Sequence, residues 1–176
     1  MNEALQSTLR RLRLSGLAQT LDVRLQEAAG HQLNHAEFLE LILQDELAVR
    51  QERLINRRLK AASFRDQRTL EDFDFAFNPS IKKKMVYDLA TGRFIREARD
   101  VLLLGPPGTG KSHLVQAIGY QAIKLGFTVL YRSIFDIVRE FLHDEALGGD
   151  PTGSGSDQVL ARYLKPDLRL FRFLRR

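Results

Sequence analysis

Leucines recur at three- and four-residue spacing through the first part of the chain. This spacing is the period of one helix face, so it predicts amphipathic helix. No proline occurs between Asn2 and Ala62, and only Gly16 and Gly30 interrupt the pattern. We therefore expect a helical region over residues 2–62, with Gly30 closing its first stretch. The leucine repeat consists of Leu5, Leu9, Leu12, Leu17, Leu21 and Leu25.

A second helix is predicted from His35 to about Ala62. Asn34 and Glu37 form a capping box, in which each side chain satisfies a backbone N–H of the first helical turn. A helix of this length cannot bury its apolar side alone, so we expect it to pack on the earlier helices or on another chain. Its apolar stripe consists of Phe38, Leu41, Ile42, Ala48, Ile55 and Leu59, and Arg50, Arg53, Arg57 and Arg58 crowd its later turns.

Residues 63–79 change in character. Phe73, Phe75 and Phe77 alternate with smaller or acidic residues before Asn78-Pro79. Period-two aromatics predict an extended strap that lays three rings on a core. A binding ladder of aromatic rings is the alternative that we favour less.

A short helix is predicted after the strap. Ser80 is its expected N-cap, Ala90 its approximate end, and Ile81, Met85 and Leu89 its inward side chains. Three lysines at positions 82–84 oppose the helix dipole. We interpret them as solvated charge, with phosphate contact as the alternative.

One motif carries chemistry. The aliphatic run Val101–Leu104 predicts a strand, Gly105–Ser112 follows the pattern GxxxxGK[ST], and His113–Tyr120 continues as an amphipathic helix. Glycines let such a loop turn its backbone N–H groups onto phosphate oxygens, and the following helix adds the positive end of its dipole. The motif therefore predicts a nucleotide triphosphate site.

Each residue of the loop has an expected role. Lys111 is expected to contact the β- and γ-phosphates of ATP, and the Ser112 hydroxyl to ligate Mg²⁺. His113 is expected to lie beside the phosphates. The candidate cofactor-binding residues are Gly105, Pro106, Pro107, Gly108, Thr109, Gly110, Lys111, Ser112 and His113, with Ser112 the candidate metal ligand.

The sequence resembles the IstB-like ATP-binding proteins, helpers of the transposase in bacterial insertion sequences and relatives of helicase loaders. The N-terminal helical region carries this resemblance together with the segments Thr69–Ile81, Val101–Leu114, Phe127–Val138 and Tyr163–Leu168. The resemblance implies a helical DNA-binding domain ahead of an AAA+ ATPase core. It also implies DNA, the transposase and further copies of the chain as partners.

The predicted organisation follows from these segments. Residues 1–62 form a helical domain for DNA or a partner, and residues 63–79 the strap. Residues 80–168 form a partial AAA+ core, and residues 169–176 an aberrant basic tail. The predicted fold class is α/β with an incomplete P-loop core, mostly helical overall.

A second strand is predicted over Phe127–Arg132. Ser133 and Asp136 resemble another capping box, which starts a helix with Phe135, Val138, Phe141 and Leu142 on its face. Residues 148–156 read as a loop. A short helix follows Asp157 and stops before Pro166.

The family pattern breaks after Leu168. The resemblance implies a third strand that ends in two acidic residues, one for Mg²⁺ and one for the attacking water. The chain instead reads RLFRFLRR, and Asp167 precedes this segment. We therefore expect a truncated or frameshifted core without the Walker B, sensor and arginine-finger elements, and with ATP hydrolysis absent or negligible.

The same break affects the expected sheet. Without the neighbouring strands of the family fold, we expect both Val101–Leu104 and Phe127–Arg132 to lack ladder partners, and the core after Val101 to be only partly ordered. For the tail we favour out-of-frame text over an edge strand. Two further alternatives remain open: a helical DNA- or protein-binding module that needs no nucleotide, and an inactive gene fragment.

Composition narrows the setting. The 176 residues contain no cysteine, which excludes disulfides, thiolate zinc sites and cysteine nucleophiles. No apolar run is long enough to span a membrane and no signal core begins the chain, so we expect a cytoplasmic protein. Four of the five net positive charges lie in the last eight residues, so the overall charge is weak evidence for a nucleic-acid surface.

Overall fold

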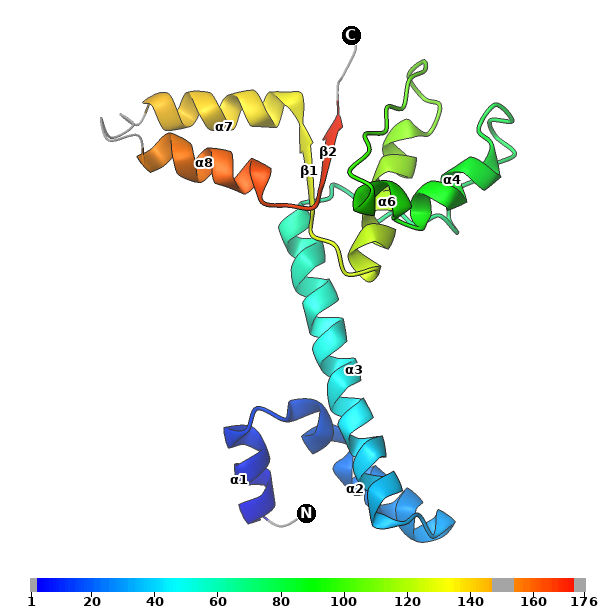
Figure 1. The fold of residues 1–176 in the computed structure, drawn as a ribbon, viewed down its shortest axis with the longest axis vertical. Helices are drawn as coiled ribbons and strands as arrows, with labels where there is room; N and C mark the ends of the chain where they lie inside the picture. The colour runs from blue at the N-terminus through cyan, green and yellow to red at the C-terminus, as the bar shows by residue number, and fades with distance from the viewer. Residues whose placement is uncertain (1–2, 147–153, 173–176) are drawn as a thin grey trace. The chain divides into compact units, whose positions relative to one another are not determined.

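The computed structural model describes residues 3–146 and 154–172. They divide into two compact units, Met1–Asn56 and Arg57–Arg176, and the boundary falls within one long helix. Helices predominate, and the described residues contain one parallel sheet of two strands (Figure 1). The predicted class, a mostly helical α/β chain with an incomplete sheet, is confirmed.

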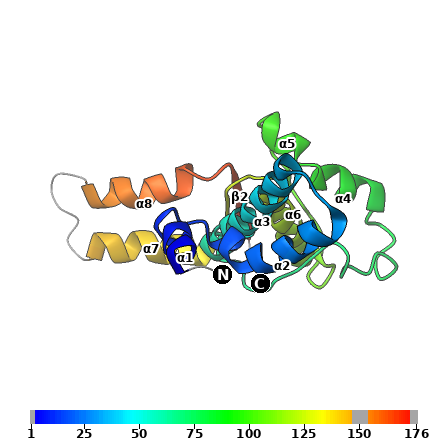
Figure 2. The ribbon, with the colours of Figure 1, turned by 90° about the horizontal axis from the view of Figure 1, so that it is seen from below.

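The first unit consists of α1 (Glu3–Arg11), α2 (Ser15–His31) and the first part of α3 (His35–Ala62). Helix α2 lies along the first part of α3 (Figures 1 and 2). The buried side chains between the helices are Leu9, Leu17, Leu21 and Ile42. They come from the predicted apolar stripes, although Leu5, Leu12 and Leu25 are exposed.

The capping box before α3 is confirmed. Asn34 Oδ1 accepts the backbone N–H groups of Ala36 and Glu37 at 2.9 and 3.0 Å, and Glu37 Oε2 accepts the Asn34 N–H at 2.9 Å. Gly30 closes the stretch as predicted to within one residue, because α2 ends at His31. The predicted break at Gly16 is wrong, because Gly16 lies inside α2. The chain turns instead at Arg13 and Gln32, which adopt positive φ values of 58° and 52°.

Gly16 allows α2 to pack closely on α3. A Cβ at this position would lie 2.9 Å from Val49 Cβ and 3.0 Å from the Asp45 carbonyl oxygen. Only a residue without a side chain therefore lets the start of α2 approach α3 this closely.

The close approach brings a buried carboxylate to the start of α2. Glu46 is 3% exposed, and its Oε2 accepts the N–H groups of Gly16 at 2.7 Å and Leu17 at 3.1 Å. Arg50 Nε donates to Oε1 at 2.7 Å. Burial raises the pKa of Glu46, but the bonds from Arg50 and the two backbone N–H groups outweigh burial and lower it. A side chain of α3 thus caps α2.

The second unit holds the sheet between two groups of helices. It contains α4 (Lys83–Ala90), α5 (Arg93–Arg96), α6 (Lys111–Lys124), β1 (Val129–Ser133), α7 (Ile134–Ala146), α8 (Ser154–Leu164) and β2 (Leu168–Arg172). Helices α7 and α8 lie on one side of the strands, and α4 and α6 on the other (Figures 1 and 2). A buried cluster of Leu70, Val86, Ala90, Leu114 and Ala117 joins the strap, α4 and α6.

Strand β1 has a partner, which corrects the expectation that it would have none. It pairs in parallel with β2, from Val129 opposite Leu168 to Ser133 opposite Arg172. Leu168 is buried and Phe171 is exposed, as the alternation of a strand requires. Residues 169–172 of the tail therefore form the edge strand that was the less favoured alternative. The out-of-frame origin of the tail stays a prediction. Residues 173–176 lie outside the described residues.

Two contacts hold β2 in place. A Cβ at Gly119 of α6 would lie 2.6 Å from Leu170 Cδ1, so the glycine lets the strand pack directly on the helix. At the start of the sheet, Asp167 Oδ2 accepts both the N–H and the hydroxyl of Thr128 at 2.7 Å. These bonds lower the pKa of Asp167. Asp167 therefore fastens the two strands together.

The predicted strand Val101–Leu104 is not a strand in the structure. Leu102 and Leu104 are 75% and 82% exposed, and Leu103 packs on the buried cluster. Among the described residues, neither β1 nor β2 pairs with this segment. A strand needs a neighbour for its backbone groups, and these residues have none among the described strands, as the expected lack of a ladder partner implied.

The strap and α4 also differ from expectation. Phe73 and Phe75 pack on the buried cluster, but Phe77 is 72% exposed because an Asx turn at Asp74 redirects the chain. Ser80 does not cap α4. Its hydroxyl donates to Asn78 Oδ1 at 2.6 Å, and Lys82 is the N-cap residue. Val86 is buried, whereas Met85 is exposed.

The capping box before α7 is confirmed, since Asp136 Oδ2 accepts the Ser133 hydroxyl at 2.6 Å and the Asp136 N–H donates to Ser133 Oγ at 3.2 Å. Phe135, Val138 and Leu142, however, are exposed. The predicted loop 148–156 lies largely outside the described residues. Within the described ranges, no helix combines the length and the apolar character that crossing a bilayer requires.

We expect Glu46→Ala to destabilise the chain by about 2 kcal/mol at neutral pH, because two buried N–H groups lose their acceptor. Urea unfolding followed by circular dichroism measures the change. Glu40→Ala, an exposed position on α3, is the control and is expected to have little effect.

The same carboxylate predicts a pH dependence. Since the folded pKa lies below the ordinary value, the contribution of Glu46 is present above that value and is lost as the pH falls through the folded pKa. Glu46→Gln should therefore make stability less sensitive to acid. An unchanged acid profile would contradict this role.

Candidate functional site

The loop Gly105–Gly110 leads directly into α6. Gly108 and Gly110 have φ values of 80° and 84°, a region that side chains disfavour. Gly110 is the N-cap of α6, and the first helical bond runs from the Leu114 N–H to its carbonyl oxygen at 3.0 Å. The N–H groups of residues 111–113 therefore have no acceptor within the helix, and they lie at the positive end of its dipole.

Lys111 closes over the loop. Its Nζ donates to the Pro106 carbonyl oxygen and, at 3.1 Å, to Thr109 Oγ1. The Thr109 hydroxyl donates to the same Pro106 oxygen at 2.9 Å. The ammonium is thus held by neutral oxygens of the loop, which an anionic ligand can replace with stronger charge-assisted bonds.

The strap covers the side of the loop at Gly110. A Cβ at Gly110 would lie 2.6 Å from Phe73 Cε2, so the ring rests against the loop backbone. His113 Nε2 lies 2.9 Å from the Thr69 carbonyl oxygen, and the rings of His113 and Phe73 meet edge to face at 5.2 Å. The His113 ring, predicted to lie beside phosphates, is held by the strap.

Gln116 is a further residue of this site that the loop motif did not identify. It is 4% exposed, and its Oε1 accepts the N–H groups of Arg65 and Asp66 at 3.2 and 3.3 Å. Its Nε2 donates to the Ser112 carbonyl oxygen at 3.1 Å. The side chain therefore ties the strap to the first turn of α6. A polar residue between Leu114 and Ala117 on the apolar face is the signal that could have revealed it.

The arrangement fits a triphosphate. It combines backbone N–H groups at a helix N-terminus, glycines in the conformations such a loop needs, and one lysine whose present acceptors are neutral. Among the described residues, no group of three or more acidic or histidine side chains could hold a metal by itself. A magnesium ion would therefore depend on Ser112 and the phosphates together.

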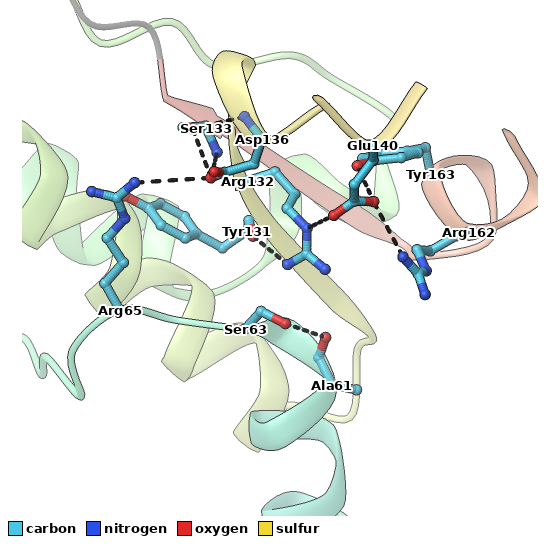
Figure 3. Close-up of polar contacts among 10 residues, drawn as sticks. All are labelled: Ala61, Ser63, Arg65, Tyr131, Arg132, Ser133, Asp136, Glu140, Arg162 and Tyr163. Atoms are coloured by element: carbon cyan, nitrogen blue, oxygen red, sulfur yellow. Dashed lines mark hydrogen bonds and ion pairs between the residues drawn. The ribbon is translucent and has the colours of Figure 1, made fainter. Parts of the chain in front are cut away.

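A separate hollow of about 330 Å³ lies near the start of α7 (Figure 3). Its charges are largely paired: Arg65 with Asp136 at 3.8 Å, and Arg132 with Glu140 at 3.3 Å. Tyr163 donates to Glu140 at 2.7 Å, and burial together with this carboxylate raises the pKa of Tyr163 to about 12. The network joins β1, α7 and α8, which is a structural role.

Two glycine variants distinguish the cost of positive φ in the loop from the cost of losing its contact with the strap. Gly108→Ala and Gly110→Ala both place a side chain at positive φ, which costs about 1–2 kcal/mol. Only at position 110 would the new Cβ also meet a ring, whereas nothing lies within 4 Å at position 108. We expect Gly110→Ala to lower the unfolding free energy further, by about 1–3 kcal/mol. Equal destabilisation of the two variants in urea unfolding would contradict the contact.

Comparisons with known proteins agree on one family. The profile of the IstB-like ATP binding proteins matches residues 7–170. An ATP-binding protein described in an insertion sequence of Mycobacterium tuberculosis is 36% identical over 93% of this chain and 62% of its own length. The corresponding protein of insertion sequence IS21 from Pseudomonas aeruginosa is 42% identical over 72% of this chain and 48% of its own.

A third relative, from insertion sequence IS5376 of Geobacillus stearothermophilus, is 31% identical over 80% of this chain and 56% of its own length. The chain thus spans about half to three-fifths of these curated relatives. With the family profile covering nearly the whole chain, and with the glycine loop placed at the start of α6, the chain belongs to the IstB-like ATP binding protein family.

Proposed function

We propose that the chain binds ATP with Mg²⁺ at Gly105–Ser112 and acts as a helper protein in the transposition of an insertion sequence. The observation that carries the proposal is the loop itself, with glycines at positive φ directly before the free N–H groups of α6. The descriptions of the relatives as insertion-sequence ATP-binding proteins support it.

Each part of the loop has a role in binding. The backbone N–H groups from Gly108 to His113 would donate to phosphate oxygens. Lys111 would leave the Pro106 carbonyl oxygen and bind the β- and γ-phosphates, which offer it full negative charge. The Ser112 hydroxyl would ligate Mg²⁺, which supplies charge neutralisation between the phosphates. Pro106, Pro107 and Thr109 would shape the turn.

The proposal includes absent or negligible ATP hydrolysis. In the family pattern the strand beside β1 ends in two acidic residues, but β2 occupies that place and carries Arg169 and Arg172. Asp167, the residue directly before β2 in the sequence, is already bonded to Thr128. No side chain within β2 can therefore position the attacking water.

DNA, a transposase and further copies of the chain are the partners that we propose in the cytoplasm. Two of the four arginines of α3 have side-chain partners within the first unit. Arg50 is bonded to Glu46, and Arg53 donates to the Ser15 hydroxyl at 2.6 Å. We therefore favour a nucleotide-binding function over the alternative of a helical module that binds DNA or protein without nucleotide.

Titration of the full chain with a fluorescent ATP analogue and Mg²⁺ tests the proposal. We expect saturable binding that Lys111→Ala weakens at least about tenfold, because the charge-assisted contact is lost. Lys124→Ala is the matched control, since it removes a cation at the other end of α6 beside Tyr120. We expect phosphate release to stay near the buffer rate in all three proteins.

Two outcomes would contradict the proposal. Equal affinity of the wild type and Lys111→Ala would show that the loop is not the binding site. Rapid phosphate release that Lys111→Ala abolishes would contradict the proposed lack of ATP hydrolysis. It would not contradict the proposed nucleotide binding.

A further inference from the structure

Phe73 and Thr69 of the strap meet the phosphate loop at two separate points. The Phe73 ring occupies the space beside Gly110 where a side chain would otherwise stand. Three residues further along, His113 is fastened to the Thr69 carbonyl oxygen. These contacts bracket Lys111 and Ser112, the two residues of the proposed phosphate and magnesium contacts.

The strap is itself held firmly at this place. The Thr69 hydroxyl donates to Asp72 Oδ2 at 2.7 Å, and the Asp72 N–H donates back to Thr69 Oγ1 at 3.3 Å. Leu70 is buried in the cluster beneath α6. The Phe73 N–H closes the turn onto the Leu70 carbonyl oxygen at 3.3 Å. The atoms that touch the loop therefore belong to a braced turn.

A turn that is held in this way can raise the affinity of the loop for a ligand by limiting the conformations of the loop. A loop that must arrange several N–H groups around phosphates loses affinity if it samples other conformations before binding. Gly110, with a φ of 84°, leaves the backbone free to sample other conformations, because glycine has the widest conformational range. Contact with the Phe73 ring at Gly110 removes part of this freedom.

We propose that Phe73, supported by the bond between His113 and Thr69, is a positioning residue that holds the phosphate loop in its binding conformation. The inference rests on the proposed nucleotide binding and adds the strap to that site. Because coupling between two events is reciprocal, nucleotide binding should in turn hold the strap more tightly on α6.

The test uses the full chain with Phe73→Ala, Phe73→Leu and the matched control Phe77→Ala, which removes the exposed ring of the same strap. Hydrogen–deuterium exchange of residues 105–112 without nucleotide reports the loop directly. Titration with the fluorescent ATP analogue and Mg²⁺ reports affinity. Exchange of α8, remote from the loop along the chain, shows whether a variant has lost its wider fold.

We expect Phe73→Ala to speed exchange of the loop and to weaken nucleotide binding, each by about tenfold, since preorganisation is lost. Phe73→Leu should restore part of both, because an apolar side chain again lies beside Gly110. Phe77→Ala should match the wild type, and α8 should exchange equally in all four proteins.

A second pair of variants tests the other contact. His113→Gln retains an N–H donor for the Thr69 carbonyl oxygen, whereas His113→Leu does not. We expect faster loop exchange in His113→Leu than in His113→Gln.

Loop exchange that is the same in Phe73→Ala and Phe77→Ala would overturn the inference, as would faster exchange of α8 to the same degree as the loop. If the wild type fails to bind nucleotide, the proposed function is wrong, and the exchange data still decide whether the strap positions the loop.

Discussion

The second unit depends on how closely other segments approach α6. Gly110 at its N-cap lets the Phe73 ring lie against the backbone, and Gly119 in its third turn lets Leu170 do the same from β2. Buried Gln116 fastens the strap between these two points. The strap, the sheet and the loop thus all contact one helix, α6. The N–H groups of its first turn lie next to the contact at Gly110.

The proposed function separates the binding of a phosphate from its cleavage. Gripping requires backbone N–H groups, a lysine and a hydroxyl, all of which lie within one turn and the helix that follows. Cleavage requires carboxylates at the end of a neighbouring strand. In this chain the strand beside β1 is β2, which carries Arg169 and Arg172 and packs on α6 at Gly119 through Leu170.

Local chemistry made much of the fold predictable from sequence. The capping boxes at Asn34 and Ser133 located the starts of α3 and α7, because each box satisfies backbone groups within four residues. Long-range partners were not predictable in this way. Alternation alone could not show that Leu168–Arg172 would pair with β1. The lack of a ladder partner for Val101–Leu104 among the described residues was expected, but that expectation came from the family resemblance and not from a local pattern.

The same distinction applies to the site. The sequence motif identified the residues of the loop, and the roles assigned to them remain predictions. The contacts from Phe73 and Thr69 arise 37 and 44 positions away from Gly110 and His113, so no local pattern linked them. Of the inward residues predicted for α4, Met85 is exposed, and Val86 is buried in its place.

A crystal structure of the full chain with a non-hydrolysable ATP analogue and Mg²⁺ tests the account most directly. We predict the triphosphate on the N–H groups before and within the first turn of α6, Lys111 Nζ moved from the Pro106 oxygen to the phosphates, and the Phe73 ring still against Gly110. A triphosphate bound instead in the arginine-lined hollow beside α7, or a loop that closes only after Phe73 has left it, would contradict the account.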